Sequence, residues 1–260
     1  MKKKLGLIFI CGIILFGVCS CKNKENNVNN NKPTLIKELK CDVLNNVKYS
    51  FDNYFITNNN DLYILNTDQL YSNNKNCKKI NSNENIIKLM AVISTTNNYY
   101  EYYVLDDKNN IYYINNIELI LQTYINNENY DVPVFKTFID NNIISQYTYF
   151  ALKNDGNLYW YEKIYQKQDE NKLVLFKKYD NEIILEYNFT IAAHGYIKTN
   201  KAFYTTKVIN QEQCEKYVDV ECKYDLAKNV QLTNIYDDIS IYKLDSTYIT
   251  KDGKMYQLNN

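Results

Sequence analysis

A ten-residue pattern of apolar and polar positions recurs five times along the chain without internal gaps. In each copy the third residue is aliphatic, the ninth is large and apolar, and the tenth is tyrosine. The five copies cover residues 54–63, 103–112, 150–159, 195–204 and 247–256. Their final tyrosines lie 45 to 52 residues apart, which indicates five similar structural units.

Each copy predicts a β-hairpin, because its polar middle carries residues that favour a tight turn. Asp155-Gly156 and Asp252-Gly253 are the strongest of these pairs, and they suit a two-residue turn in which both central residues have positive φ. Such a turn places the third residue of the copy opposite the tenth. Ile56, for example, is then expected to face Tyr63.

Apolar residues occupy both faces of these hairpins. The second position of each copy is apolar or aromatic as well: Phe55, Val104, Ala151, Tyr196 and Tyr248. A sheet with one face in water alternates cleanly between apolar and polar residues. The hairpins are therefore expected to be covered on both faces, as they are in the stacked blades of a β-propeller.

Further short strands are expected between the hairpins. Apolar segments of strand length occur at residues 86–89, 132–138, 173–176, 183–185 and 239–242. A period near 48 residues accommodates four strands and their turns, and no helical periodicity is present. We therefore predict an all-β domain over residues 34–260, a β-propeller of five blades with about four antiparallel strands each.

Two of the copies resemble a known repeat. Leu152–Tyr159 and Ile249–Tyr256 each combine an aliphatic residue, an Asp-Gly turn and a hydrophobic-Tyr pair, a pattern similar to the regulator of chromosome condensation repeat family. The resemblance covers about ten residues per repeat and implies a propeller. The Gly pairs of that family are missing from the other strands here, so the partners of the family are not carried over.

The amino-terminal segment has the plan of a secretory leader. Lys2–Lys4 precede an unbroken apolar or Gly stretch, Leu5–Cys19. As a helix this stretch rises about 22 Å, which is less than the ~30 Å hydrocarbon core of a bilayer. Val18-Cys19-Ser20-Cys21 resembles the bacterial lipobox. That resemblance implies transfer of a diacylglyceryl group to the Cys21 sulfur and cleavage before this residue.

These features predict a signal peptide over residues 1–20, a lipidated tether over 21–33 and the propeller over 34–260. Six of the nine residues from Asn23 to Asn31 are asparagine, as suits a solvated linker. The lipid would hold the protein at the cell membrane, facing the extracellular or periplasmic side. Lipidation at Cys19, ordinary secretion and an uncleaved anchor are the alternatives.

Four cysteines remain after Cys21, an even number that favours disulfides in an exported protein. The expected pairs are Cys214–Cys222, which closes a short polar loop, and Cys41–Cys77, which flanks the first hairpin. Four free thiols are the alternative. No metal site is expected, because the spacing is not CxxC and the chain has a single histidine.

The charge composition argues against a nucleic-acid partner. The chain has 30 basic and 30 acidic residues, and removal of the three leader lysines leaves the remainder near −3. Every basic residue is lysine, so the fork-shaped arginine side chain that recognises phosphate is missing. The abundance of Asn, Ile, Lys and Tyr matches A/T-rich codons, so the 27 tyrosines do not by themselves indicate a sugar-binding surface.

No residue set in the sequence points to catalysis, and no cofactor is expected. His194, the single histidine, has no marked nucleophile nearby and is expected to be structural. Trp160 is expected to pack between blades, with a sugar-stacking surface as the alternative. The acidic residues that would suit a propeller glycosidase, which spacing alone cannot bring together, are Asp52, Asp106, Asp140 and Asp180.

We therefore expect a non-enzymatic, membrane-tethered propeller that binds a protein or glycan outside the cell through its top face or central pore. Loops from every blade of a propeller gather around one funnel, which favours recognition. The alternatives are a lectin-like glycan-binding propeller, a glycosidase with pore-lining carboxylates and a scaffold in envelope assembly. Carboxylates at the ring centre would favour an enzyme, and aromatic residues a lectin.

Overall fold

The computed structural model describes residues 32–93, 100–122, 140, 142–147, 150–162, 172–189, 195–208, 224–243 and 246–258. The expected leader, most of the expected tether, the strand expected at 132–138, His194, Cys214 and Cys222 lie outside these residues. Within the described ranges, no helix is long and apolar enough to cross a membrane.

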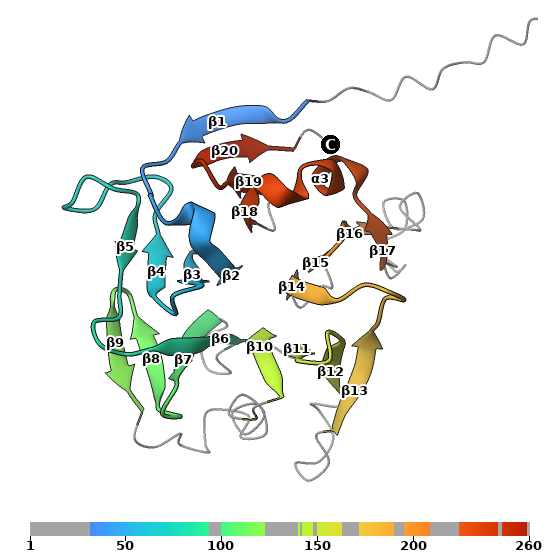
Figure 1. Cartoon of the computed structure of the whole chain (residues 1–260), viewed down its shortest axis with the longest axis horizontal. Helices are drawn as coiled ribbons and strands as arrows, with labels where there is room; N and C mark the ends of the chain where they lie inside the picture. Colours follow the sequence, from blue (N-terminus) through green and yellow to red (C-terminus); the bar gives the residue numbers. More distant parts are fainter. Residues whose placement is uncertain are drawn as a thin grey trace, which may run out of the picture.

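The described strands form five antiparallel four-stranded blades arranged in a ring around a central axis (Figure 1), so the five-bladed propeller is confirmed. Blade one contains β2 (Val47–Phe51), β3 (Tyr54–Thr57), β4 (Leu62–Leu65) and β5 (Cys77–Lys79). Blade two contains β6 (Ile86–Ile93), β7 (Tyr100–Asp106), β8 (Ile111–Asn115) and β9 (Glu118–Leu121). Blade three contains β10 (Ile143–Tyr147), β11 (Phe150–Lys153), β12 (Leu158–Glu162) and β13 (Lys172–Lys177).

Blade four contains β14 (Ile184–Phe189), β15 (Gly195–Thr199), β16 (Phe203–Val208) and β17 (Tyr224–Lys228). Blade five contains β18 (Ile239–Tyr242), β19 (Thr247–Thr250), β20 (Lys254–Gln257) and β1 (Thr34–Glu38). The inner strands β2, β6, β10, β14 and β18 surround the axis (Figure 1), and β6 pairs in parallel with β10 of the next blade. Three short helical segments complete the described structure: η1 (Leu44–Asn46), α3 (Val230–Asn234) and η2 (Tyr236–Asp238).

The hairpins are present in all five copies, but their predicted register is wrong in four of them. In blade one, Ile56 lies opposite Leu62, the ninth residue, instead of Tyr63. The turn has three residues: the Thr57 amide donates to the Asp61 carbonyl, and only Asn60 has positive φ, at 61°. This is a type I turn followed by one left-handed residue, the usual three-residue hairpin loop.

The same three-residue turn occurs in blades two, three and five. The left-handed residue always occupies the seventh position of the copy: Asn60, Asn109, Gly156 and Gly253. The fourth copy has Lys201 there, and its backbone is not left-handed. That copy alone has the predicted register, with Ile197 opposite Tyr204, because lysine disfavours the left-handed conformation that the longer loop requires.

Both faces of each hairpin are buried, as predicted. The second and third positions of all five copies lie in the core. One cluster joins blade one to blade five, with Phe55 and Leu65 packed near Ile249 and Met255. The inter-blade packing explains the sequence pattern, since each sheet is covered by a neighbour on both sides.

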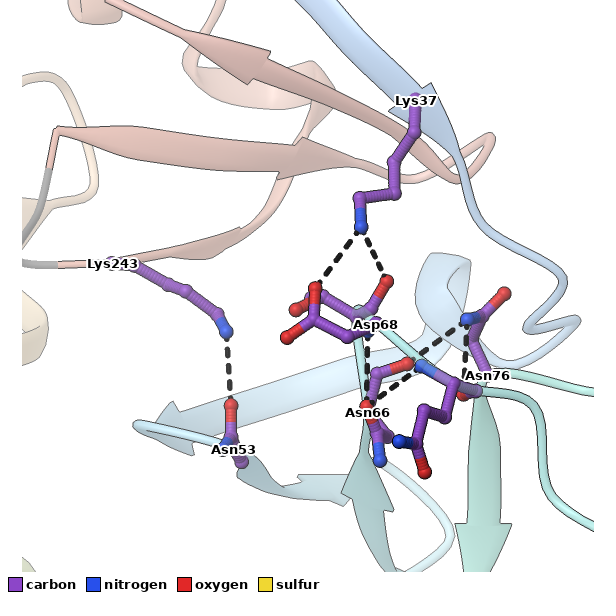
Figure 2. Close-up of polar contacts among 8 residues, drawn as sticks. Lys37, Asn53, Asn66, Asp68, Asn76 and Lys243 are labelled. Atoms are coloured by element: carbon purple, nitrogen blue, oxygen red, sulfur yellow. Dashed lines mark hydrogen bonds and ion pairs between the residues drawn. The ribbon is translucent and has the colours of Figure 1, made fainter.

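The amino-terminal strand closes the ring. β1 pairs antiparallel with β20, so the first described strand is the outermost strand of the last blade. Figure 2 shows two lysine contacts at this junction: Lys37 Nζ lies 2.6 Å from the Thr67 carbonyl, and Lys243 Nζ lies 2.9 Å from Asn53 Oδ1. Contacts between blades one and five therefore complete the circle through side chains as well as through strand pairing.

A buried asparagine and a disulfide hold the segment that follows β1. The Lys40 amide donates to Asn76 Oδ1 at 2.8 Å. Asn76 Nδ2 donates to the Asn66 carbonyl at 2.9 Å (Figure 2). Cys41 and Cys77 form a disulfide, one of the two pairs expected from the sequence. The chain between β1 and β2 is thus fastened to β5, the outer strand of blade one.

Gly253 gives a testable consequence of this closure. Its φ is +87°, and a Cβ added there would lie 2.6 Å from the Leu39 carbonyl oxygen, a backbone atom. Gly253→Ala is expected to lower the free energy of unfolding by about 1–3 kcal/mol, measured by urea denaturation. Gly156→Ala is the matched control, because its φ of +75° is similar but its added Cβ lies nearest to the Ile183 Cγ2 methyl group, at 2.6 Å, and not to a backbone oxygen. Equal losses in the two variants would contradict this explanation.

Candidate functional site

Every inner strand begins with a β-bulge at the same place. The register shifts between Val47 and Tyr49 in β2, and between Ile184 and Glu186 in β14. The extra residues of the five strands are Lys48, Ile87, Ile144, Leu185 and Ser240. A bulge frees one residue from strand pairing and changes the direction of its side chain. Since the inner strands surround the axis, these five residues lie around the axis where the strands begin (Figure 1). We call this side of the ring the top face.

Backbone hydrogen bonds make the top face a rigid frame. In each blade the hairpin turn donates an amide to the carbonyl just ahead of the inner strand. In blade one the Asn58 amide donates to Asn46 at 2.9 Å, and in blade five the Lys251 amide donates to Asp238 at 2.8 Å. The other three bonds join Asp107 to Asn85, Asn154 to Asn142 and Asn200 to Ile183. Side chains at the axis are therefore carried on fixed backbone, as a binding site requires.

A cavity of about 210 Å³ opens where β2, β14 and β18 begin. We call it the axial cavity. Three lysines from three blades line it: Lys48, Lys198 and Lys251. Lys198 Nζ lies 3.5 Å from the Ile239 carbonyl, and none of the three lysines forms an ion pair with a described residue. Lys48 Nζ also lies 5.8 Å from the Tyr49 ring centroid and Lys198 Nζ 5.5 Å from that of Phe203. The cavity therefore carries three ammonium groups that contact rings or a carbonyl but form no ion pair with a described residue.

Glu186 also lines the axial cavity and is almost fully buried, at 6% exposure. Its Oε1 accepts hydrogen bonds from Ser50 Oγ at 3.0 Å and from the Tyr196 hydroxyl at 2.8 Å. Burial and the neighbouring Glu186 carboxyl raise the pKa of Tyr196 well above its usual value, so the hydroxyl remains a neutral donor.

The bond from Ser50 to Glu186 crosses the centre of the ring. Ser50 lies on β2 and Glu186 on β14, whereas the inner strand between these two blades is β18. A second contact joins the same strands one residue deeper, with the Phe51 and Tyr187 ring centroids 6.1 Å apart. The core is therefore filled below the axial cavity, and Glu186 lies at its floor.

A shallower groove of about 500 Å³ adjoins the cavity and shares Lys251 with it. Its lining is polar and rich in amides, including Asn45, Asn73 and Asn74. Lys75 also lines the groove and pairs with Asp42. The axial cavity and this groove together form the candidate binding site of the described structure.

The four carboxylates suggested by the sequence do not meet at the axial cavity. Asp106 is buried within its own turn: burial alone would raise its pKa, but hydrogen bonds from Asn110, Lys108 and Tyr112 outweigh burial and lower it. Asp52 accepts a hydrogen bond from the Tyr102 hydroxyl in the turn between β2 and β3. Asp140 and Asp180 are exposed. Among the residues described, no three His, Cys, Asp or Glu side chains are grouped in a way that could hold a metal ion.

Trp160 does not pack between blades, so that expectation is wrong. It lies on β12, the third strand of blade three, and is 41% exposed. Its ring centroid is 6.2 Å from that of Phe176 on β13 of the same blade. The tryptophan is thus on the outer half of its blade, away from the inner strand, and Phe176 beside it is also exposed.

Glu186 and the three lysines are not among the functional residues predicted from the sequence. A weak signal for Glu186 is present, since this acid follows the apolar run Ile183–Leu185 and precedes Tyr187 within a strand. The lysines carry no such signal, because each comes from a different blade and lysine is common throughout the chain.

Comparison of the chain with protein-family models and with curated proteins finds no match. The residues of the top face and the amino-terminal sequence are therefore the features that bear on function.

Proposed function

We propose that the chain is an exported, lipid-anchored propeller that binds an extracellular partner at its top face without catalysing a reaction. The observation that carries the binding part is the axial cavity, where three lysines without ion pairs to described residues line an opening between blades one, four and five. Charged groups that are held on a rigid frame and form no ion pair with a described residue favour recognition of a partner of opposite charge.

The amino terminus supports the anchoring part of the proposal. The basic and apolar leader ends in the lipobox-like Val18–Cys21, and an asparagine-rich segment leads to β1. β1 is the outermost strand of blade five (Figure 1), so the chain enters the described structure at the rim of the ring. The Cys41–Cys77 disulfide suits a compartment outside the reducing cytosol.

Replacement of Cys21 by serine tests the anchor. The unaltered chain, expressed in a bacterium and fed a labelled fatty acid, is expected to carry the label and to sediment with membranes. Cys21→Ser is expected to lose the label entirely, because the hydroxyl cannot replace the thiol nucleophile. Cys19→Ser is the control and is expected to behave like the unaltered chain. Label that persists in Cys21→Ser, or disappears in Cys19→Ser, would contradict lipidation at Cys21.

A charge-reversal pair tests the binding face. Lys48→Glu combined with Lys198→Glu is expected to reduce binding of the full chain to the cell surfaces or matrix that it contacts, measured by fluorescence of the labelled protein. Lys228→Glu is the matched control, since Lys228 is exposed on the outer strand β17, away from the axis. Equal binding by the double variant and the control would contradict a role for the top face.

A glycan is the alternative partner to a protein, and a glycosidase is the alternative function. Glycoside hydrolysis uses a pair of carboxyl groups on either side of the scissile bond. Glu186 is the one carboxyl that the described residues contribute to the axial cavity, and two donors already bond its Oε1. Binding without hydrolysis is therefore the function that this geometry favours.

A further inference from the structure

We infer that the axial cavity binds an acidic sugar, a ring that carries a carboxylate together with free hydroxyl groups, as a uronic acid does. This inference deepens the proposed function and rests on it. It follows from the three lysines that line the cavity, from the Glu186 carboxyl group, whose Oε2 accepts no hydrogen bond from a described residue, and from the volume of the cavity.

The lysines select for a negative group. Lys48, Lys198 and Lys251 belong to blades one, four and five, yet all three line the same cavity. Their ammonium groups are point charges with rotatable donors, which suit a carboxylate approached from several directions. Lys198 is half-buried, so its charge is less screened by water than a surface charge. A ligand with a carboxylate at the mouth of the cavity would satisfy these groups.

The floor selects for hydrogen-bond donors. Ser50 and Tyr196 both donate to Glu186 Oε1, whereas Oε2 accepts no hydrogen bond from a described residue. A bare inorganic anion lodged at the floor would be repelled by this carboxyl group. A sugar hydroxyl can donate to Oε2 while the carboxylate on the same ring faces the lysines. Lys198 lies opposite Glu186 in the β14–β15 pairing, so ammonium groups and a carboxyl acceptor line the same cavity. This lining matches a molecule that carries both a carboxylate and hydroxyl groups.

The volume restricts the ligand to about one ring. The axial cavity has a volume of about 210 Å³. It is smaller than the roughly 300 Å³ at which pockets for drug-sized molecules begin. Leu185 is 46% exposed at the cavity and offers an apolar surface for the carbon face of a ring.

The adjoining groove provides room for a neighbouring sugar. It begins at the shared Lys251 and continues past the amides of Asn45, Asn73 and Asn74. Amide side chains both donate and accept hydrogen bonds, as recognition of hydroxyl groups requires. The acidic ring is therefore assigned to the axial cavity and the rest of a glycan to the groove.

The test measures binding of methyl glucuronoside and methyl glucoside to the full chain in detergent by calorimetry, with acetate as the bare anion. The glucuronoside is expected to bind about tenfold or more tightly than either of the others, because only it offers both the charge and the hydroxyls.

The variants test which residues bind the glucuronoside. Lys48→Met and Lys198→Met are each expected to weaken its binding about tenfold, and added salt is expected to weaken it further. Glu186→Gln is expected to weaken both sugars but not acetate. Lys228→Met is the control and should leave binding unchanged.

Several outcomes would overturn the inference. Equal binding of glucoside would exclude selection by charge, and equal binding of acetate would reduce the cavity to a general anion site. Unchanged binding in both lysine variants would place the sugar elsewhere, and loss of binding in Trp160→Ala alone would assign it to blade three. If no sugar binds but the double variant Lys48→Glu, Lys198→Glu still loses binding to cell surfaces or matrix, the inference fails and the proposed function stands. If no sugar binds and the double variant still binds cell surfaces or matrix normally, both the inference and the proposed binding at the top face fail.

Discussion

Phe203→Ala is expected to lower the free energy of unfolding by about 3–5 kcal/mol. The ring is fully buried on β16 of blade four and packs near Tyr196, with centroids 6.1 Å apart. It also contacts blade five, where the Tyr242 ring centroid lies 5.8 Å away. Truncation therefore removes apolar burial and leaves a cavity between two blades that strand pairing does not join.

Urea denaturation followed by circular dichroism measures this loss. Phe176→Ala is the matched control, because it removes the same side chain from an exposed position on β13. Phe176→Ala is expected to lower the free energy of unfolding by about 1 kcal/mol or less. Similar losses in the two variants would mean that the interface between blades four and five contributes little to the stability of the ring.

Removal of the Cys41–Cys77 disulfide is expected to lower the free energy of unfolding by about 3–4 kcal/mol. The two cysteines are separated by 36 positions in sequence. In the chain-entropy model, a cross-link over a loop of this length stabilises by an amount between the ~3 kcal/mol of a 15-residue loop and the ~4.7 kcal/mol of a 100-residue loop. Its position matters as well, because the bond fastens the segment after β1 to the outer strand of blade one.

The double variant Cys41→Ala, Cys77→Ala is compared with the unaltered chain by thermal and urea unfolding, with and without a thiol reductant. Reductant is expected to destabilise the unaltered chain by the same amount as the double substitution. Any effect of reductant that persists in the double variant reports on Cys214 and Cys222. An unaltered chain whose unfolding does not respond to reductant would contradict a stabilising Cys41–Cys77 bond.

Much of the architecture could be predicted from the apolar pattern. The aliphatic residues at the third position and the apolar residues at the second are buried in all five copies, because each hairpin is covered by blades on both sides. Burial on both faces is the physical signature of stacked sheets.

The turn geometry was harder to predict, because the same residues serve two kinds of loop. Asp155-Gly156 suits a two-residue turn, but Gly156 also suits the left-handed third residue of a longer loop. The discriminating feature is the seventh position of each copy. Asn or Gly there accompanies the three-residue loop, and Lys201 accompanies the shorter one.

The candidate site could not be predicted from spacing, because its members are brought together only by ring closure. Lys48 and Lys251 lie at opposite ends of the chain and become neighbours when β1 pairs with β20. The Ser50–Glu186 bond spans 136 positions in sequence. A local motif search has no access to contacts that depend on the number of blades and on the order of the strands.

Closure by β1 also has a mechanical consequence. A force that pulls on the chain ahead of Thr34 loads the β1–β20 pairing first, because that strand is the outermost one of its blade. Peeling would free β1 and then stop at Cys41, where the covalent link to Cys77 transfers the load to blade one. The four blades built from continuous chain would remain intact while the fifth frays, so the disulfide acts as a stop against mechanical unravelling.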